Sequence, residues 1–264
     1  MPAAPPPPPP LPSCVKCCPT ATTTTTVKKC QLNDATFSQG GWAKEHPDIL
    51  KACFLARVCE RGIPKKCQYR DIRSIIQVGP TCGLTALSMI LDGSPSAGEL
   101  LADAVELKYT LNGEMFSGHN LHKLTNKHLK IGSCQLHEGA INCTNIREHI
   151  LSGGCLLVAY DAAVNHEPCL KKGRSAHWAL ILGYLIDTED EFHVVARHGK
   201  TRNLAVWSLA ALSESNANLL EFVTPKGYTD CEFLLPDGGI AGPLGLNERC
   251  ILLHELPQEI IKLH

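Results

Sequence analysis

The chain has 264 residues, of which 44% are hydrophobic, so it is long enough to bury one sizeable core. Its 25 lysine and arginine residues nearly balance its 26 aspartate and glutamate residues, and this charge gives no argument for nucleic acid or an anionic membrane as a partner. Because there is no signal-peptide pattern and no apolar run of about 18 residues, and because the 14 cysteines are too sparse for a disulfide scaffold, we expect a cytoplasmic protein with reduced thiols.

Residues 1–31 have the composition of a disordered tail rich in proline and threonine. Its six consecutive prolines, Pro5–Pro10, favour a polyproline II conformation that resembles a profilin ligand, and a flexible spacer is the alternative. The C-x-x-C of Cys14 and Cys17 has too few neighbouring ligands for a zinc site, and no glycine-rich phosphate loop follows a strand. We therefore predict no metal and no cofactor.

The folded domain is expected over residues 32–264, and the periodicity of its first half is mainly helical. "HPDILKACFLARVCERG" (46–62) predicts an N-terminal accessory helix. "CGLTALSMIL" (82–91) predicts a helix that begins at Cys82 and ends at an Asp-Gly turn. The same apolar spacing predicts three further helices, within 97–109, 118–130 and 144–154.

After Gly154 the pattern changes to short apolar or β-branched runs separated by charged turns. These runs predict antiparallel strands, namely "CLLVAYD" (155–161), "HWALILGYLI" (177–186) and "FHVVARHG" (192–199). A helical first half followed by an antiparallel sheet around one core predicts an α+β fold.

Cys82 is a candidate nucleophile because of its place in "QVGPTCGLTAL" (77–87). The free N–H groups at a helix N-terminus lower the pKa of a cysteine and favour the reactive thiolate. Gln77, a short distance upstream, carries an amide that can donate to a developing oxyanion beside the Cys82 main-chain N–H. A buried packing cysteine is the alternative, since free cysteine is among the most buried residue types.

His177 supplies the base that such a nucleophile requires. It opens the apolar strand "HWALILGYLI", and a cysteine on a helix facing a histidine on a strand is how papain-like folds form a thiolate and imidazolium pair. The chain has 12 histidines, so His177 alone is a weak indication. The combination of Q-x-G-P-x-C-G with a later A-H-W predicts a cysteine peptidase.

Several stretches of the sequence resemble a known protein family. "QVGPTCGLTAL", "LNGEMFS", "YDAAVNHEPCLKKGRSAHWAL" and "SLAALSESNANL" are similar to strings of the actin maturation proteases, cytosolic cysteine aminopeptidases with a proline-rich N-terminus. The resemblance runs from about Ile72 to Thr224 and implies Cys82 as nucleophile, His177 as base and Gln77 as oxyanion donor. It also implies removal of the acetylated N-terminal Met or Cys from newly made actin, with profilin as a carrier of that substrate.

The residue that orients the histidine departs from the papain-like pattern. Papain-like peptidases place Asn or Asp on the strand after the histidine, and the matching stretch here, "VVARHGK", offers His198 instead. A neutral imidazole accepts a hydrogen bond but stabilises an imidazolium poorly. We predict His198 as a possible orienter, with Asp187 and Asn203 as alternatives.

Three cations precede His177 in the chain, and we predict that they bind substrate. Lys171, Lys172 and Arg174 would receive the acidic residues of an actin N-terminus, and an ordinary solvated turn is the alternative. Two other functions fit the same sequence. One is a catalytically silent profilin or actin adaptor, and the other is a cysteine peptidase for another acylated or double-glycine substrate.

Overall fold

The computed structural model describes residues 39–58, 60, 62–224 and 228–263. The proline-rich tail, with its predicted profilin ligand and its C-x-x-C, lies outside these residues. Within them, no helix is both long enough and apolar enough to cross a membrane.

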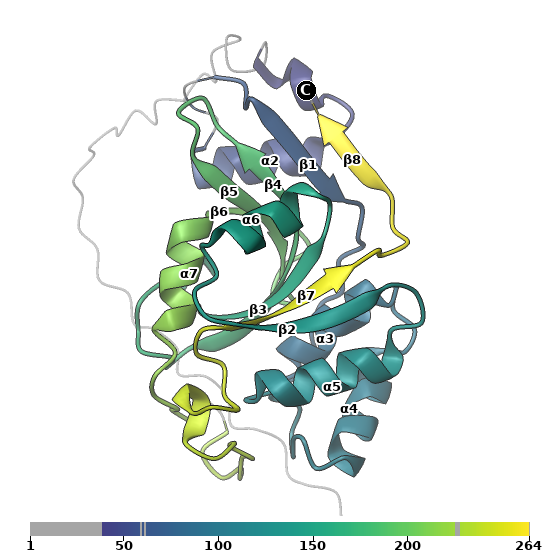
Figure 1. The fold of residues 1–264 in the computed structure, drawn as a ribbon, viewed down its shortest axis with the longest axis vertical. Helices are drawn as coiled ribbons and strands as arrows, with labels where there is room; N and C mark the ends of the chain where they lie inside the picture. Colours follow the sequence, from purple (N-terminus) through teal and green to yellow (C-terminus); the bar gives the residue numbers. More distant parts are fainter. Residues whose placement is uncertain (1–38, 59, 61, 225–227, 264) are drawn as a thin grey trace, which may run out of the picture.

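An eight-stranded sheet forms the centre of the structure, and every strand pair in its described part is antiparallel (Figure 1). The main path runs β2-β7-β3-β4-β1-β8, while β5 pairs with β4 and with β6. The strands are β1 Lys66–Arg70, β2 Ser133–Glu138, β3 Cys155–Asp161, β4 Ala176–Ile186, β5 Phe192–Arg197, β6 Ala205–Ser208, β7 Arg249–His254 and β8 Ile260–Leu263.

Helices cover both faces of this sheet. The accessory helix ends at Ala56, earlier than the predicted 62, and the helix Leu209–Ala217 is not among those that the apolar spacing predicts. The accessory helix, the helix that begins at Cys82 and the three later helices of the first half are all confirmed. The helices and 3-10 turns are η1 Gln39–Ala43, α2 Pro47–Ala56, α3 Cys82–Ile90, α4 Ala97–Glu106, α5 Gly118–His128, α6 Thr144–Leu151, α7 Leu209–Ala217 and η2 Gly239–Ala241.

The expectation of a helical first half is wrong at two strands. β1 lies before α3 and pairs with β4 and β8, and β2 lies between α5 and α6 and pairs with β7. Both are short, and both join partners from the second half of the chain. The α+β class is confirmed, but the sheet is built from both halves of the chain.

Strand β4 shows how the core is divided. Successive side chains of a strand point to opposite faces of the sheet. Trp178 and Leu180 join the core formed with α2, α3, α4 and α5, whereas Ala179 and Ile181 join a second core with α6 and α7. β4 and its neighbours form a fixed base for any site built on them. Fourteen residues of β3, β4 and β5 have no exposed surface, namely Cys155, Leu156, Leu157, Val158, Ala159, Tyr160, Asp161, Ala179, Leu180, Ile181, Leu185, Val194, Val195 and Ala196.

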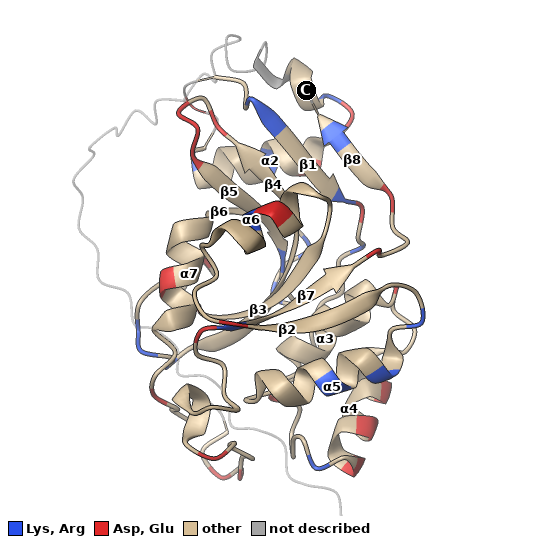
Figure 2. Ribbon diagram, in the orientation of Figure 1, with Lys and Arg blue, Asp and Glu red and all other residues tan. Residues whose placement is uncertain are grey.

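Charged residues of both signs are spread along the described chain (Figure 2). Acidic residues occur on α4 and basic ones on α5, and the Asp103 carboxylate accepts hydrogen bonds from Lys127 Nζ and His128 Nε2, each at 2.6 Å. Exposed pairs of this kind contribute little to stability. Because charges of both signs are spread in this way, recognition of a charged ligand must depend on the groups close to its binding site.

Candidate active site

A cavity of about 350 Å³ lies where α3 begins, and it brings three of the predicted residues together. Cys82, Gln77 and His177 all line it. Its remaining walls come from β4, from the segment before α5 and from the chain after α7. The predicted nucleophile, base and oxyanion donor therefore share one space.

Cys82 is the first residue of α3 and is half-buried. The first hydrogen bond of the helix joins Thr85 N–H to Thr81 C=O, so the N–H groups of Cys82 and Gly83 have no partner within the helix. Burial raises the pKa of the Cys82 thiol, and the main-chain N–H groups of Trp178 and Gly83, directed at the sulfur, oppose this rise without cancelling it. The expectation that the helix N-terminus lowers the pKa of Cys82 is therefore wrong, because burial outweighs it.

His177 precedes Trp178 on β4, and it lines the same cavity as Cys82. The His177 side chain is buried, and its Nε2 has no hydrogen-bond partner among the described residues. Burial, together with the nearby His198 and Lys200, lowers its pKa to about 3. Its imidazole is therefore neutral at physiological pH, and the resting pair is a thiol and a neutral base.

Gln77 is held against the loop that follows β5. Its main-chain N–H donates to Gly199 C=O at 2.9 Å, and its Nε2 donates to Gly79 C=O at 2.8 Å. One N–H of the side-chain amide is left for another acceptor, because a primary amide carries two. A Cβ on Gly199 would lie 2.8 Å from Gln77 Cβ, so the glycine leaves the space that Gln77 occupies.

His198, the predicted orienter, lies close to His177 without a hydrogen bond to it among the described contacts. The two ring centroids are 5.9 Å apart at an angle of 75°. His198 also lies 5.1 Å from the ring of His166 and stacks on Trp207 at 5.9 Å. Its Nδ1 accepts the main-chain N–H of Lys200 at 3.4 Å, so Nε2 carries the proton of the neutral ring.

The two alternative orienters are bonded elsewhere. Asp187 follows the far end of β4, and its Oδ2 bonds His193 Nε2 at 3.0 Å. Asn203 Oδ1 accepts from Lys51 Nζ at 3.0 Å. Neither side chain is recorded in contact with His177, whereas the His198 ring lies beside it.

The loop that carries the predicted basic residues is organised by a buried carboxylate. Asp161, at the end of β3, has no exposed surface and accepts main-chain N–H groups from Lys171 at 2.6 Å, Gly173 at 2.9 Å and Ser175 at 2.9 Å. Three such bonds compensate a buried negative charge and fix the loop that leads into His177. Nothing in the spacing of Asp161 indicates this role.

The cations of this loop are largely engaged with other groups. Lys172 and Arg174 pair with Glu221 at 3.4 and 3.2 Å, and Lys171 Nζ lies 3.3 Å from a main-chain carbonyl. Arg174 lines the cavity, whereas Lys171 and Lys172 do not. Lys200, which sequence reasoning missed, is exposed, lines the same cavity, and has no ion-pair partner within the described part of the chain.

An apolar wall closes another side of the cavity, and it is formed by Met115, Phe116, Phe222, Ile240 and Leu246. Phe116 and Phe222 make an edge-to-face contact with centroids 5.0 Å apart. Such a wall suits a hydrophobic side chain of a ligand.

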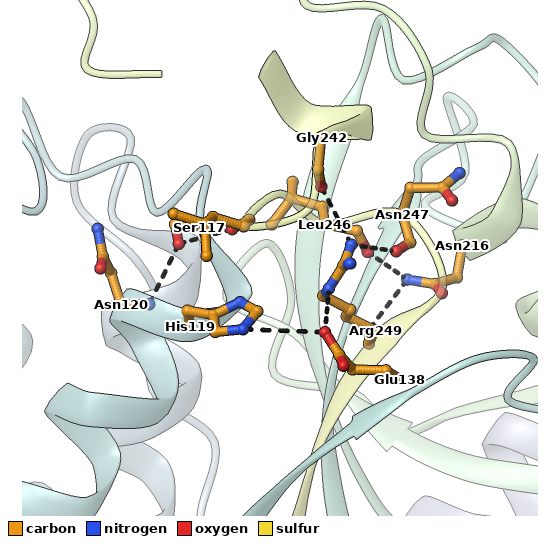
Figure 3. Close-up of polar contacts among 10 residues, drawn as sticks. Ser117, His119, Asn120, Glu138, Asn216, Gly242, Leu246, Asn247 and Arg249 are labelled. Atoms are coloured by element: carbon orange, nitrogen blue, oxygen red, sulfur yellow. Dashed lines mark hydrogen bonds and ion pairs between the residues drawn. The ribbon is translucent and has the colours of Figure 1, made fainter. Parts of the chain in front are cut away.

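A polar network fixes the part of this wall that follows α7 (Figure 3). Arg249 Nη1 donates to the carbonyls of Gly242 at 3.2 Å and Asn247 at 2.9 Å, while its Nε bonds Glu138 at 3.1 Å. Asn216, on α7, donates to the Leu246 carbonyl at 3.2 Å. Because the bonds to Gly242, Asn247 and Leu246 end on main-chain carbonyls, they hold the wall in place whatever side chains it carries.

Comparison with known proteins shows the family of this chain. A family model described as "Actin maturation protease-like, C-terminal domain" matches residues 72–185. A Drosophila melanogaster protein named actin maturation protease is 59% identical over 230 residues, which cover 87% of this chain and 86% of that protein. The chain belongs to the actin maturation protease family. A human protein of that name is 30% identical over 277 residues, covering 86% of this chain and 77% of that protein, and a mouse protein is 31% identical over 235 residues, covering 72% and 63%.

Membership of the actin maturation protease family supports a peptidase and agrees with the geometry of the cavity. The matched range contains Gln77, Cys82 and His177. His198 and Lys200 lie beyond it, as does the wall that the Arg249 network holds.

Proposed function

We propose that this chain is a cysteine aminopeptidase that removes the acetylated N-terminal Met or Cys from newly made actin. The observation that carries the proposal is the pairing of Cys82, at the start of α3, with His177, at the start of β4, in one cavity. The relatives reported above are named actin maturation proteases, which supports actin as the substrate.

The proposed reaction begins with a neutral pair. As Cys82 Sγ attacks the carbonyl carbon of the first residue, His177 accepts the thiol proton. The oxyanion is bound by the Cys82 main-chain N–H and by the Gln77 amide, a pair of donors that acts most strongly on the transition state. His177 then gives its proton to the leaving amine, and water hydrolyses the thioester. Burial disfavours both the Cys82 thiolate and the His177 imidazolium before substrate is attacked. Proton transfer from the thiol to the imidazole therefore accompanies the attack and does not precede it.

Recognition of the substrate is divided between two sides of the cavity. The apolar wall would bind the Met or Cys side chain, and a volume of about 350 Å³ lies near the lower end of the range for small-ligand sites, about 300–1,000 Å³. That size suits one capped residue. Lys200 and Arg174, with the Lys171 and Lys172 loop beside them, would attract the acidic residues that follow the scissile bond.

The remaining parts of the proposal concern delivery and location. The polyproline run would dock on profilin and raise the local concentration of the actin that profilin carries. Such a route places the enzyme in the cytoplasm. Deleting residues 1–31 should then slow processing of actin bound to profilin while leaving the cleavage of a free peptide unchanged.

The test is mass spectrometry of acetylated actin N-terminal peptides incubated with wild type, Cys82→Ala and His177→Ala. Loss of one acetylated residue with the wild type alone supports the peptidase, its nucleophile and its base. Absence of cleavage by every variant, with whole actin and profilin also supplied, would refute the proposal and favour the adaptor.

A further inference from the structure

Glu114 has a buried carboxyl group without a partner inside the candidate active site. The side chain is only 7% exposed, and neither Oε1 nor Oε2 has a hydrogen-bond partner among the described residues. It lines the same cavity as Cys82. An unpaired buried carboxyl group costs free energy, so its presence here indicates a partner that arrives with the substrate.

The main chain on both sides of Glu114 is fixed against the catalytic elements. Gly113 has φ +118°, and a Cβ there would lie 2.8 Å from Thr81 Cγ2, so only glycine fits beside the residue that precedes the nucleophile. Its N–H donates to Thr110 Oγ1 at 2.9 Å. On the other side, the Met115 carbonyl accepts the Trp178 indole N–H at 2.8 Å. The carboxyl group is therefore held in place between α3 and β4.

The surroundings of Glu114 favour the neutral acid. Burial raises the pKa of this carboxyl group, and no lysine or arginine is recorded in contact with it among the described residues. Its charge also raises the pKa of Cys82, so a carboxylate would oppose formation of the thiolate. A neutral carboxyl group presents one O–H donor and one carbonyl acceptor.

The O–H donor matches the acyl carbonyl of a blocked N-terminus. In an acylated N-terminal residue this carbonyl accepts a hydrogen bond, while the N–H of the same trans amide points the other way. A free α-ammonium offers three donors and no acceptor, and it would enter a cavity already lined by the cations Arg174 and Lys200. The blocked terminus is the better match on both counts.

We propose that Glu114 is the residue that distinguishes a blocked N-terminus from a free one, by donating its O–H to the acyl carbonyl oxygen. The proposal rests on the proposed function, because it assigns a specificity-determining residue to the same reaction. It adds a role for the side chain that the nucleophile, base and oxyanion donor leave unused.

The test compares two peptides of one sequence, one acetylated and one with a free N-terminus, and measures kcat/KM by mass spectrometry. Glu114→Gln retains a neutral donor and acceptor and should keep the acetylated peptide within about 10-fold of wild type. Glu114→Ala should lose about 10- to 100-fold on the acetylated peptide, the cost of leaving the buried acyl carbonyl without a donor, and much less on the free one. The ratio between the two peptides should then collapse only in the alanine variant.

Two controls separate the outcomes. Glu148→Gln makes the same chemical change on the exposed side of α6 and should leave both rates unchanged. Thermal melting of Glu114→Ala should show no loss of stability, because the substitution removes an unsatisfied buried group. An equal loss on both peptides in Glu114→Ala overturns the assignment of Glu114. A Glu114→Gln variant as impaired as Glu114→Ala overturns it as well. In either case, cleavage by the wild type leaves the proposed function standing. If wild type cleaves neither peptide, the proposed function fails, and the Glu114 assignment fails with it.

Discussion

Replacing Gly199 by alanine should displace the oxyanion donor without touching the nucleophile or the base. The new Cβ would lie 2.8 Å from Gln77 Cβ and 2.9 Å from Gln77 Oε1, closer than real Cβ contacts allow. The clash is with the root of the side chain as well as its end, so a change of rotamer cannot relieve it. Gln77 must move with its main chain, which is joined to Gly199 by a hydrogen bond of 2.9 Å.

The expected magnitude follows from what Gln77 contributes. Removing one oxyanion donor lowers kcat by about 10²- to 10³-fold, which corresponds to about 2.7–4 kcal/mol of transition-state stabilisation. The overpacking itself costs about 1–3 kcal/mol of folding stability. The variant should therefore remain folded at 25 °C while kcat on the acetylated peptide falls toward that of Gln77→Ala.

The assay is kcat on the acetylated actin peptide, with two comparisons. Gly98→Ala, on α4, meets nothing closer than 4.0 Å and should leave kcat unchanged. In a Gln77→Gly background the clash and the amide are both absent, so adding Gly199→Ala should cost little more. Wild-type kcat in Gly199→Ala, or an undiminished further loss in the Gln77→Gly background, would refute the role of Gln77.

Three further predictions test the charges and the loop around the site. Because burial raises the Cys82 pKa, the rate of iodoacetamide alkylation at Cys82 should rise with pH beyond the usual thiol value of about 8.5, and a rate already maximal at pH 5 would indicate a preformed thiolate. Asp161→Ala should orphan three main-chain N–H groups and lower the free energy of unfolding by about 3 kcal/mol or more in urea titrations, and a loss below about 1 kcal/mol would contradict the role given to it. Lys200→Glu and Arg174→Glu should each raise KM for an acidic actin peptide far more than for an uncharged acetyl-peptide, with the difference shrinking as salt rises, and equal effects on both peptides would exclude charge recognition.

Much of the fold, and the positions of the proposed catalytic residues Cys82 and His177, can be predicted from local sequence patterns. Helix α3 has apolar residues at helical spacing from its first turn, and β4 is a long apolar run, so both elements are predictable from neighbouring residues. Cys82 and His177 each lie at the start of such an element. Their meeting in one cavity is inferred from the chemistry that a cysteine and a histidine perform together.

The features that sequence reasoning missed depend on distant partners. β1 and β2 are too short to be recognised alone and exist through pairing with β4, β7 and β8. Lys200 acquires its surroundings from segments far along the chain, and Asp161 acquires its role from the way the following loop folds back on its carboxylate. The raised pKa of Cys82 is a matter of burial, which outweighs the helix terminus that the local pattern shows.

The most direct test of the central claim is covalent labelling with an acetyl-methionyl chloromethyl ketone, followed by peptide mapping. Other cysteines of the described residues compete for such a reagent, because Cys134, Cys143 and Cys169 are half-buried like Cys82 and Cys231 is exposed. The account predicts labelling at Cys82, in step with the loss of actin-peptide cleavage, and much slower labelling in His177→Ala. Labelling at another cysteine, or an unchanged rate in His177→Ala, would contradict the catalytic pair.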